Sequence, residues 1–149
     1  MFARVLGLFV LILSVSACSG SSQDSGGEGA QGGAGGTENK AQAEEFDRAA
    51  IGTWMAETCS VEQGDSELEL VTIEGKGKGT IDANVYRGNT GCQGTPVFKK
   101  GNAFTYNVKR FVSGSGEITI GGSSFDITIE RRTMVIQFNG NKGVYVKLK

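Results

Sequence analysis

Few side chains in this chain are suited to catalysis. None of the 149 residues is a histidine, which excludes Ser-His-Asp and Cys-His catalysis, histidine general bases and most zinc sites. The remaining acid–base candidates are carboxylates such as Asp82, Asp126 and Glu130, which fall on the expected outward positions of alternating segments. A solvated surface explains such carboxylates more simply than catalysis does. The sequence therefore predicts a non-enzymatic protein with no catalytic residue, no metal site and no cofactor.

Charge and glycine spacing argue against nucleic acids and nucleotides as ligands. The chain has 15 Lys and Arg against 16 Asp and Glu, and this balance lacks the concentrated basic face of a nucleic-acid-binding protein. The glycine-rich run 75–80 bridges two expected strands and does not open a helix. It therefore lacks the context that a phosphate-binding loop needs.

The first residues read as a targeting segment. Residues 1–17 contain one positive charge, Arg4, then an apolar run that ends at Val15 and is too short for a permanent membrane span. The sequence Val-Ser-Ala-Cys at 15–18 resembles the lipobox of bacterial lipoprotein signal peptides. This resemblance implies a diacylglyceryl thioether on Cys18, cleavage before it and acylation, palmitate included. The alternative is an ordinary secretory signal with a chance cysteine.

The same resemblance implies a location. In the lipoprotein family an Asp after the lipidated cysteine commonly retains the protein at the inner membrane, and this chain has Ser19 at that position. We therefore expect a lipid anchor in the bacterial outer membrane, facing the periplasm. Two or three acyl chains would make that attachment durable, because each buried methylene contributes about 0.8 kcal/mol.

Residues 18–45 are rich in Gly, Ser, Gln and Glu and poor in aliphatic side chains. Such a composition buries too little apolar surface to offset chain entropy, so we expect a flexible tether. A surface-export signal is an alternative interpretation of its acidic residues. Residues 41–50 are suited to a single helical turn that leads into the domain, with Phe46 covering the base of the domain.

From residue 51 onward the pattern changes to short β-type runs separated by glycine-bearing turns. Expected strands cover 51–58, 67–73, 80–86, 96–99, 103–112, 117–120, 124–130, 133–138 and 143–148. Such short connections pair sequential strands antiparallel. We therefore expect residues 46–149 to form an all-β domain, a small up-and-down barrel of eight or nine strands, because closure removes exposed edges. A two-sheet sandwich is the alternative.

Alternation along these strands predicts which side chains face inward. Leu68 and Leu70 share one face of their strand, and Arg110 is expected among an inward aromatic set. The expected inward sets of the later strands are Phe104, Tyr106, Val108 and Val112, then Ile118 and Ile120, Phe125, Ile127 and Ile129, Met134, Ile136 and Phe138, and Val144, Val146 and Leu148.

If Cys18 carries lipid, as the lipobox resemblance implies, two cysteines remain in an exported protein. A Cys59–Cys92 disulfide would stabilise a small domain by roughly 3–4 kcal/mol in the chain-entropy model. A redox-active or metal-binding pair is the alternative, although the two cysteines are widely spaced in the sequence and lack a further ligand of suitable type.

The opening of the first strand, Gly52-Thr53-Trp54, resembles the Gly-x-Trp motif of lipocalins and related calycin barrels. In that superfamily the tryptophan plugs one end of the barrel and a basic residue of the last strand packs across its ring. Lys147 is the residue of this chain that matches that role. The placing of Tyr86, Cys92 and Pro96 is similar to small bacterial lipoprotein domains that also open on Gly-Thr-Trp.

Two aromatic strands and one arginine are the best candidates for a ligand site. Tyr86, Phe104, Tyr106 and Arg110 would together suit an apolar ligand with an acidic head group. Ordinary core packing, with the arginine extending to solvent, is the simpler alternative. We expect an envelope lipoprotein that binds a small apolar ligand or an envelope protein. The alternatives are a periplasmic protease inhibitor of calycin type and a structural or assembly lipoprotein without a pocket.

Overall fold

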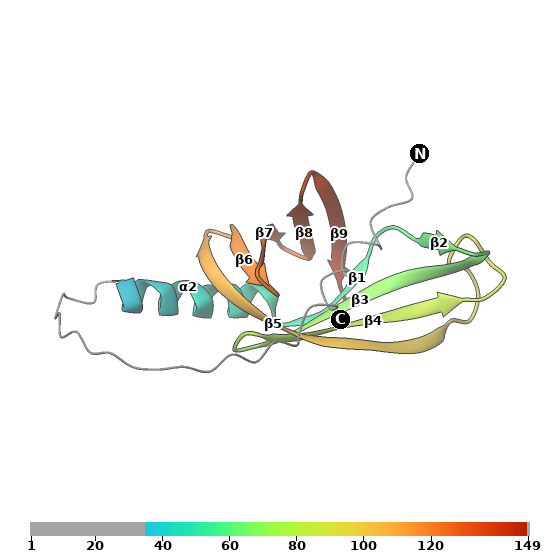
Figure 1. Ribbon diagram of the computed structural model, residues 1–149, viewed down its shortest axis with the longest axis horizontal. Coiled ribbons are helices and arrows are strands. Elements are labelled where there is room, and N and C mark those ends of the chain that lie inside the picture. The colour runs from blue at the N-terminus through green and yellow to red at the C-terminus, as the bar shows by residue number, and fades with distance from the viewer. Residues whose placement is uncertain (1–34, 149) are drawn as a thin grey trace, which may run out of the picture.

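The structure is a computed structural model, and it describes residues 35–148 (Figure 1). The predicted signal peptide, Cys18 and the first part of the predicted tether lie outside these residues, so lipidation stays a prediction. In the described part of the chain, no helix is long and apolar enough to cross a membrane.

Residues 35–148 form one helix followed by nine strands (Figure 1). The elements are α2 (Gly35–Ala50), β1 (Gly52–Ala56), β2 (Ser60–Glu62), β3 (Asp65–Gly75), β4 (Lys78–Tyr86), β5 (Val97–Val112), β6 (Ser115–Ile120), β7 (Ser123–Glu130), β8 (Thr133–Phe138) and β9 (Asn141–Lys147).

Eight of the strands close into an antiparallel barrel, which confirms the predicted fold class. The hydrogen-bonded order runs β1-β9-β8-β7-β6-β5-β4-β3, and β1 also pairs with β3, which completes the ring. The remaining strand, β2, lies outside the ring and pairs with β3 alone. Tight connections join most sequential strands, so the barrel is an up-and-down meander as expected.

Helix α2 begins at Gly35, inside the stretch predicted to be a flexible tether up to residue 45, so that boundary was wrong. Residues 38–45 are mostly good helix formers, and Glu38 and Arg48 complement the helix dipole. Phe46 and Ala50 are fully buried. The apolar side of the helix therefore packs against one end of the barrel, and this packing stabilises a helix that composition alone did not predict.

The interior alternation is confirmed for β6, β7 and β8 but wrong for β9. Trp54 lies directly opposite Lys147 in the ladder, and Tyr145 is 4% exposed. Directly opposite residues share a face, so Tyr145 and Lys147 face inward and Val144, Val146 and Leu148 face outward. Both sets contain apolar atoms, which is why alternation alone chose the wrong one.

Strand β5 joins the two strands predicted at 96–99 and 103–112 and contains two irregularities. Opposite β4 the register shifts near Gly101, whose Cβ would lie 1.7 Å from the carbonyl oxygen of Ile81. Opposite β6 it shifts between Val108 and Arg110. This second bulge turns Phe111 into the core and turns Arg110 and Val112 outward, which corrects their predicted orientation.

Part of the sheet extends beyond the barrel. β1 pairs with β3 only from Leu70 to Ile73, and β6 pairs with β5 only from Tyr106 onward. The remaining parts of β3, β4 and β5, together with β2, continue as a long twisted sheet away from the helix (Figure 1). We call residues 60–62, 65–69, 82–86 and 97–102 the ribbon.

Candidate interaction surface

The predicted contact between Trp54 and Lys147 is confirmed. The Lys147 ammonium lies 5.0 Å from the centroid of the fully buried indole, a cation–π contact. The indole Nε1 donates to the carbonyl of Ala50 at 2.7 Å, and Lys147 Nζ donates to that of Ala49 at 3.5 Å. These bonds join the end of α2 to the plug residue and close this end of the barrel.

Asp47 is the second link between helix and barrel. Its carboxylate accepts from the Tyr106 hydroxyl at 2.6 Å and from the Lys76 backbone N–H at 2.8 Å. Burial, reinforced by the neighbouring Asp47 carboxylate, raises the pKa of Tyr106. The Phe46 ring packs edge-on against Tyr106 and Phe111, each with centroids 5.2 Å apart. Tyr106 is therefore a core residue that anchors the helix.

The four residues predicted to form a ligand site do not come together. Phe104 and Tyr106 are neighbours, with ring centroids 6.4 Å apart. Tyr86 lies at the far end of β4, seven residues beyond Gly79, which pairs with Phe104; at the rise of a strand this is roughly 23 Å. Arg110 is exposed on the outer wall. The structure thus separates the aromatic pair from the other two residues.

The predicted Cys59–Cys92 disulfide is present, with Cα atoms 6.0 Å apart. It fastens the loop between β4 and β5 to the segment before β2. The Cys92 N–H also donates to the buried Ser66 hydroxyl at 2.9 Å, and the Gly88 N–H donates to Asp65 at 2.7 Å. Two hydrogen bonds to β3 and one disulfide to the segment before β2 therefore hold this loop at the end of the ribbon.

One side of the outer wall is apolar. Met55 of β1 lies opposite Val146 of β9 and opposite Leu70 of β3. Leu70 is 8% exposed although it lies outside the core cluster. On β8, Val135 lies opposite Val144. We call this surface the apolar outer face, and its members are Met55, Leu68, Leu70, Val135, Val144 and Val146. Leu68 and Leu70 are thus confirmed to share a face, which is the outer one.

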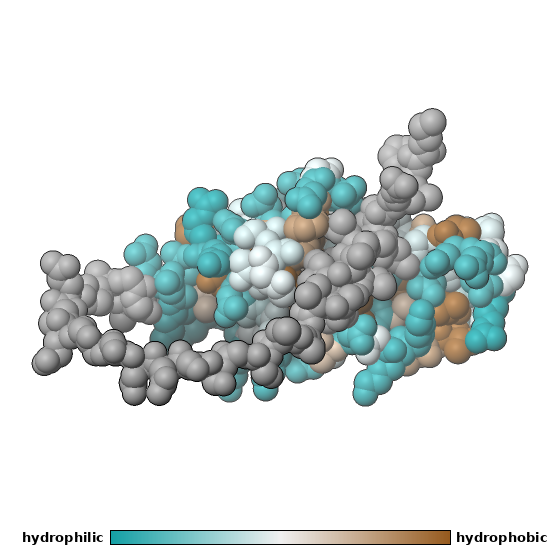
Figure 2. Space-filling model, in the orientation of Figure 1, coloured by the Kyte–Doolittle hydropathy of each residue, from teal (hydrophilic) through white to brown (hydrophobic). Residues whose placement is uncertain are grey.

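The apolar character continues onto the ribbon. In the ladder Phe98 lies opposite Asn84, which lies opposite Leu68, and Val61 and Tyr86 both lie opposite Ser66. Phe98 is 60% exposed and Val61 is 49% exposed. Figure 2 shows hydrophobic groups gathered over this end of the molecule. Large exposed apolar groups of this kind mark interaction surfaces in soluble domains when they are contiguous.

The opposite side of the wall is polar. Asn107, Thr119 and Ser124 lie side by side on β5, β6 and β7, and Glu117 lies opposite Asp126. We call this surface the polar outer face, and its members are Asn107, Glu117, Thr119, Ser124, Asp126, Thr128 and Glu130. Asp126 and Glu130 are exposed, as the sequence predicted.

A buried acid inside the barrel was not predicted. Glu69 is 8% exposed and accepts a hydrogen bond from the Tyr145 hydroxyl at 2.7 Å. Burial raises the pKa of Glu69, the Tyr145 bond opposes this change, and Glu67 adds to it. Burial and the adjacent carboxylate also raise the pKa of Tyr145. This bond joins β3 to β9 at the level of Ala56, where β1 ends, and so holds the wall together there.

Within residues 35–148, no group of three or more Cys, Asp or Glu residues is placed to hold a metal ion. No family model matches the chain, and no curated protein or solved structure matches it either. The resemblances to lipoprotein signals and lipocalins therefore rest on the residues that carry them.

Proposed function

We propose that this chain is a lipid-anchored, non-enzymatic binding module of the bacterial cell envelope, and that its partner is an envelope protein. The supporting observation is the division of the outer wall into an apolar face and a polar face. A barrel that acted only as a scaffold would gain nothing from exposing Val61 and Phe98 beside that apolar face.

The interior of the barrel offers less support for a small apolar ligand. Trp54, Phe46, Phe111, Phe125 and Met134 are fully buried and fill the space between the strands and the helix. Large side chains at these positions suit a barrel that is packed by its own residues. We therefore place binding on the outside of the wall and on the ribbon.

The protease-inhibitor alternative also receives less support. Such an inhibitor would insert an extended amino-terminal segment into a protease cleft. Here residues 35–50 form a helix whose end is hydrogen-bonded to the barrel through Asp47. Residues in a docked helix are unavailable as an extended inhibitory segment.

The anchor is tested by replacing Cys18 with Ala and fractionating cells. We expect the variant protein to leave the membrane fraction, because no residue other than cysteine can form the thioether. Ser19→Ala is the matched control and should remain with the membranes. Persistent membrane association of Cys18→Ala would contradict the anchor.

Binding is tested by native mass spectrometry of the protein extracted from its own envelope in detergent. We expect a complex with a second protein that Met55→Glu abolishes and Ser124→Glu preserves, because only the first places charge on the apolar outer face, whereas Ser124 lies opposite Thr119 on the polar outer face. A bound small molecule that survives both changes would instead favour the ligand-carrier alternative. A bare monomer in every sample would contradict the proposal.

A further inference from the structure

Strand β5 forms an unpaired edge along the ribbon. Within the part of the chain that the structure describes, residues 97–103 of β5 pair with β4, whereas β6 joins β5 only from Tyr106 onward. The row of main-chain N–H and C=O groups on the other side of this stretch therefore has no strand partner. Such a row is a template for the addition of another extended segment.

The register shows which groups point away from β4. The Tyr106 N–H donates to the carbonyl of Gly77 at 2.9 Å, so these residues form a hydrogen-bonded pair of the ladder. Because hydrogen-bonded and non-hydrogen-bonded pairs alternate, the pair of Phe104 and Gly79 is hydrogen-bonded and the pair of Ala103 and Thr80 is not. The N–H and C=O of Ala103 therefore point outward, and its side chain is exposed.

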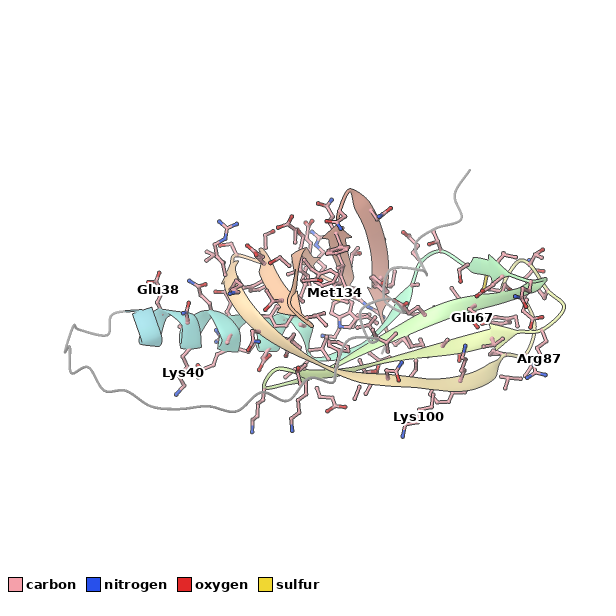
Figure 3. All side chains as sticks on the ribbon, viewed as in Figure 1. Glu38, Lys40, Glu67, Arg87, Lys100 and Met134 are labelled. Carbon is pink, nitrogen blue, oxygen red and sulfur yellow. A yellow bond between two sulfur atoms is a disulfide. The ribbon has the colours of Figure 1, made fainter. Side chains whose placement is uncertain are left out.

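The side chains along this edge select the partner by charge. Lys100 is exposed and points away from the ribbon (Figure 3). The Lys99 side chain is 64% exposed and lies 3.4 Å from Glu67, a pair in which the lysine is mostly in solvent. Lysines on a sheet edge disfavour pairing with an uncharged or a basic strand, but they attract an acidic strand.

Self-pairing is disfavoured by the same residues. If two copies joined their β5 edges antiparallel about the middle of residues 97–103, the lysines of one copy would lie beside those of the other. Like charges opposite each other in a ladder are destabilising. The bulge at Gly101 further interrupts a flat edge-to-edge match.

We infer that the β5 edge at 97–103 binds an extended, acidic segment of a partner protein as an added strand. This inference rests on the proposed function, since it names the kind of segment that the binding module recognises. The disulfide holds the ribbon in shape before the segment arrives. Binding then costs conformational entropy only in the partner segment, because the ribbon is already ordered.

The test uses the full chain in detergent and two synthetic peptides. The acidic probe is acetyl-Thr-Glu-Val-Glu-Val-Glu-Thr-amide, and the basic probe has Lys in place of Glu. We expect the acidic probe to slow amide hydrogen exchange at Ala103. It should bind about tenfold more tightly than the basic probe, because Lys99 and Lys100 then face acidic side chains in place of basic ones. Exchange at Tyr106, whose N–H is already bonded, should not change.

Two variants separate main-chain from charge recognition. Ala103→Pro removes the outward N–H while leaving the β4 ladder bonds, so it should abolish binding, whereas Ala103→Ser should retain it. Lys99→Glu combined with Lys100→Glu should reverse the preference, so that the basic probe binds more tightly than the acidic probe. If the proline variant does not fold, this double variant tests the inference in its place.

Equal affinity for the two probes, or unchanged exchange at Ala103, would overturn the inference. If the acidic probe fails while the native complex still depends on Met55, this inference alone is overturned. If that complex is absent as well, the proposed function fails with it.

Discussion

The two ends of this molecule are held together by different physics. At the helix end, Trp54, Phe46 and Phe111 are fully buried and Asp47 ties the helix to the wall. At the ribbon end, the sheet is a single layer with Phe98 60% exposed. A disulfide fastens its loop, together with two hydrogen bonds from main-chain N–H groups of the loop to the side chains of Ser66 and Asp65.

This difference separates stability from binding. A packed end leaves little surface for a partner, because its large side chains already contact one another. No described helix or strand outside the sheet covers the ribbon, so within residues 35–148 it exposes apolar groups and a strand edge that are available for binding. A covalent link substitutes there for packing, which preserves the shape of the ribbon without covering it.

Truncating the plug should have the largest effect. Trp54→Ala removes a fully buried indole, its bond to Ala50 and the cation–π contact. We expect the free energy of unfolding to fall by about 3–5 kcal/mol, measured by urea denaturation. Phe98→Ala, on the exposed ribbon, is the control and should change stability by less than about 1 kcal/mol. Equal losses of unfolding free energy in the two variants would contradict the difference between the helix end and the ribbon end.

Removing the disulfide should affect the ribbon more than the barrel. For Cys59→Ser with Cys92→Ser we expect a loss of about 2–4 kcal/mol. Amide exchange should also accelerate more at residues 60–69 than at 125–129. Uniform acceleration over both regions would mean that the ribbon is not an independently opening unit.

Asp47 should have an intermediate effect confined to the helix end. Asp47→Ala removes the acceptor of the Tyr106 and Lys76 bonds, and we expect a loss of about 2 kcal/mol. Asp126→Ala, on the polar outer face, is the matched control. Exchange protection should fall in α2 and remain unchanged at the ribbon, and the reverse pattern would contradict the assignment.

Glu69 should have the smallest effect, visible as a pH dependence. The folded state raises the pKa of Glu69 above its ordinary value of 4.5, so it holds that proton more strongly than the unfolded chain does. Stability should therefore decline as pH rises from 4.5 through the folded-state pKa. Glu69→Gln should flatten this slope in urea titrations, and Glu62→Gln should not. Identical pH slopes for the two variants would contradict the raised pKa of the buried Glu69 carboxyl.

The sequence predicted the features that depend on local pattern or on counting. The barrel follows from alternation and short turns, the Trp54–Lys147 contact from a motif, and the Cys59–Cys92 pair from the cysteine count. Helix α2 was underestimated because its stability comes from packing Phe46 against a barrel that composition cannot reveal.

The remaining errors come from register. A bulge before Arg110 reverses the direction of that side chain, and no local signal marks it. The inward face of β9 depends on Lys147 pairing with Trp54 and not on which set is more apolar. Glu69 was missed because a charged residue on an inward position contradicts the pattern used to find the core.

The central claim is that partners contact the apolar outer face and the ribbon and not the polar outer face. Site-specific photo-crosslinking in intact cells tests it most directly, with the reactive residue placed in turn at Met55, Leu68, Phe98, Asn107 and Ser124. The account predicts protein adducts from the first three positions and none from the last two. Adducts of equal yield at Asn107 and Ser124 would contradict it.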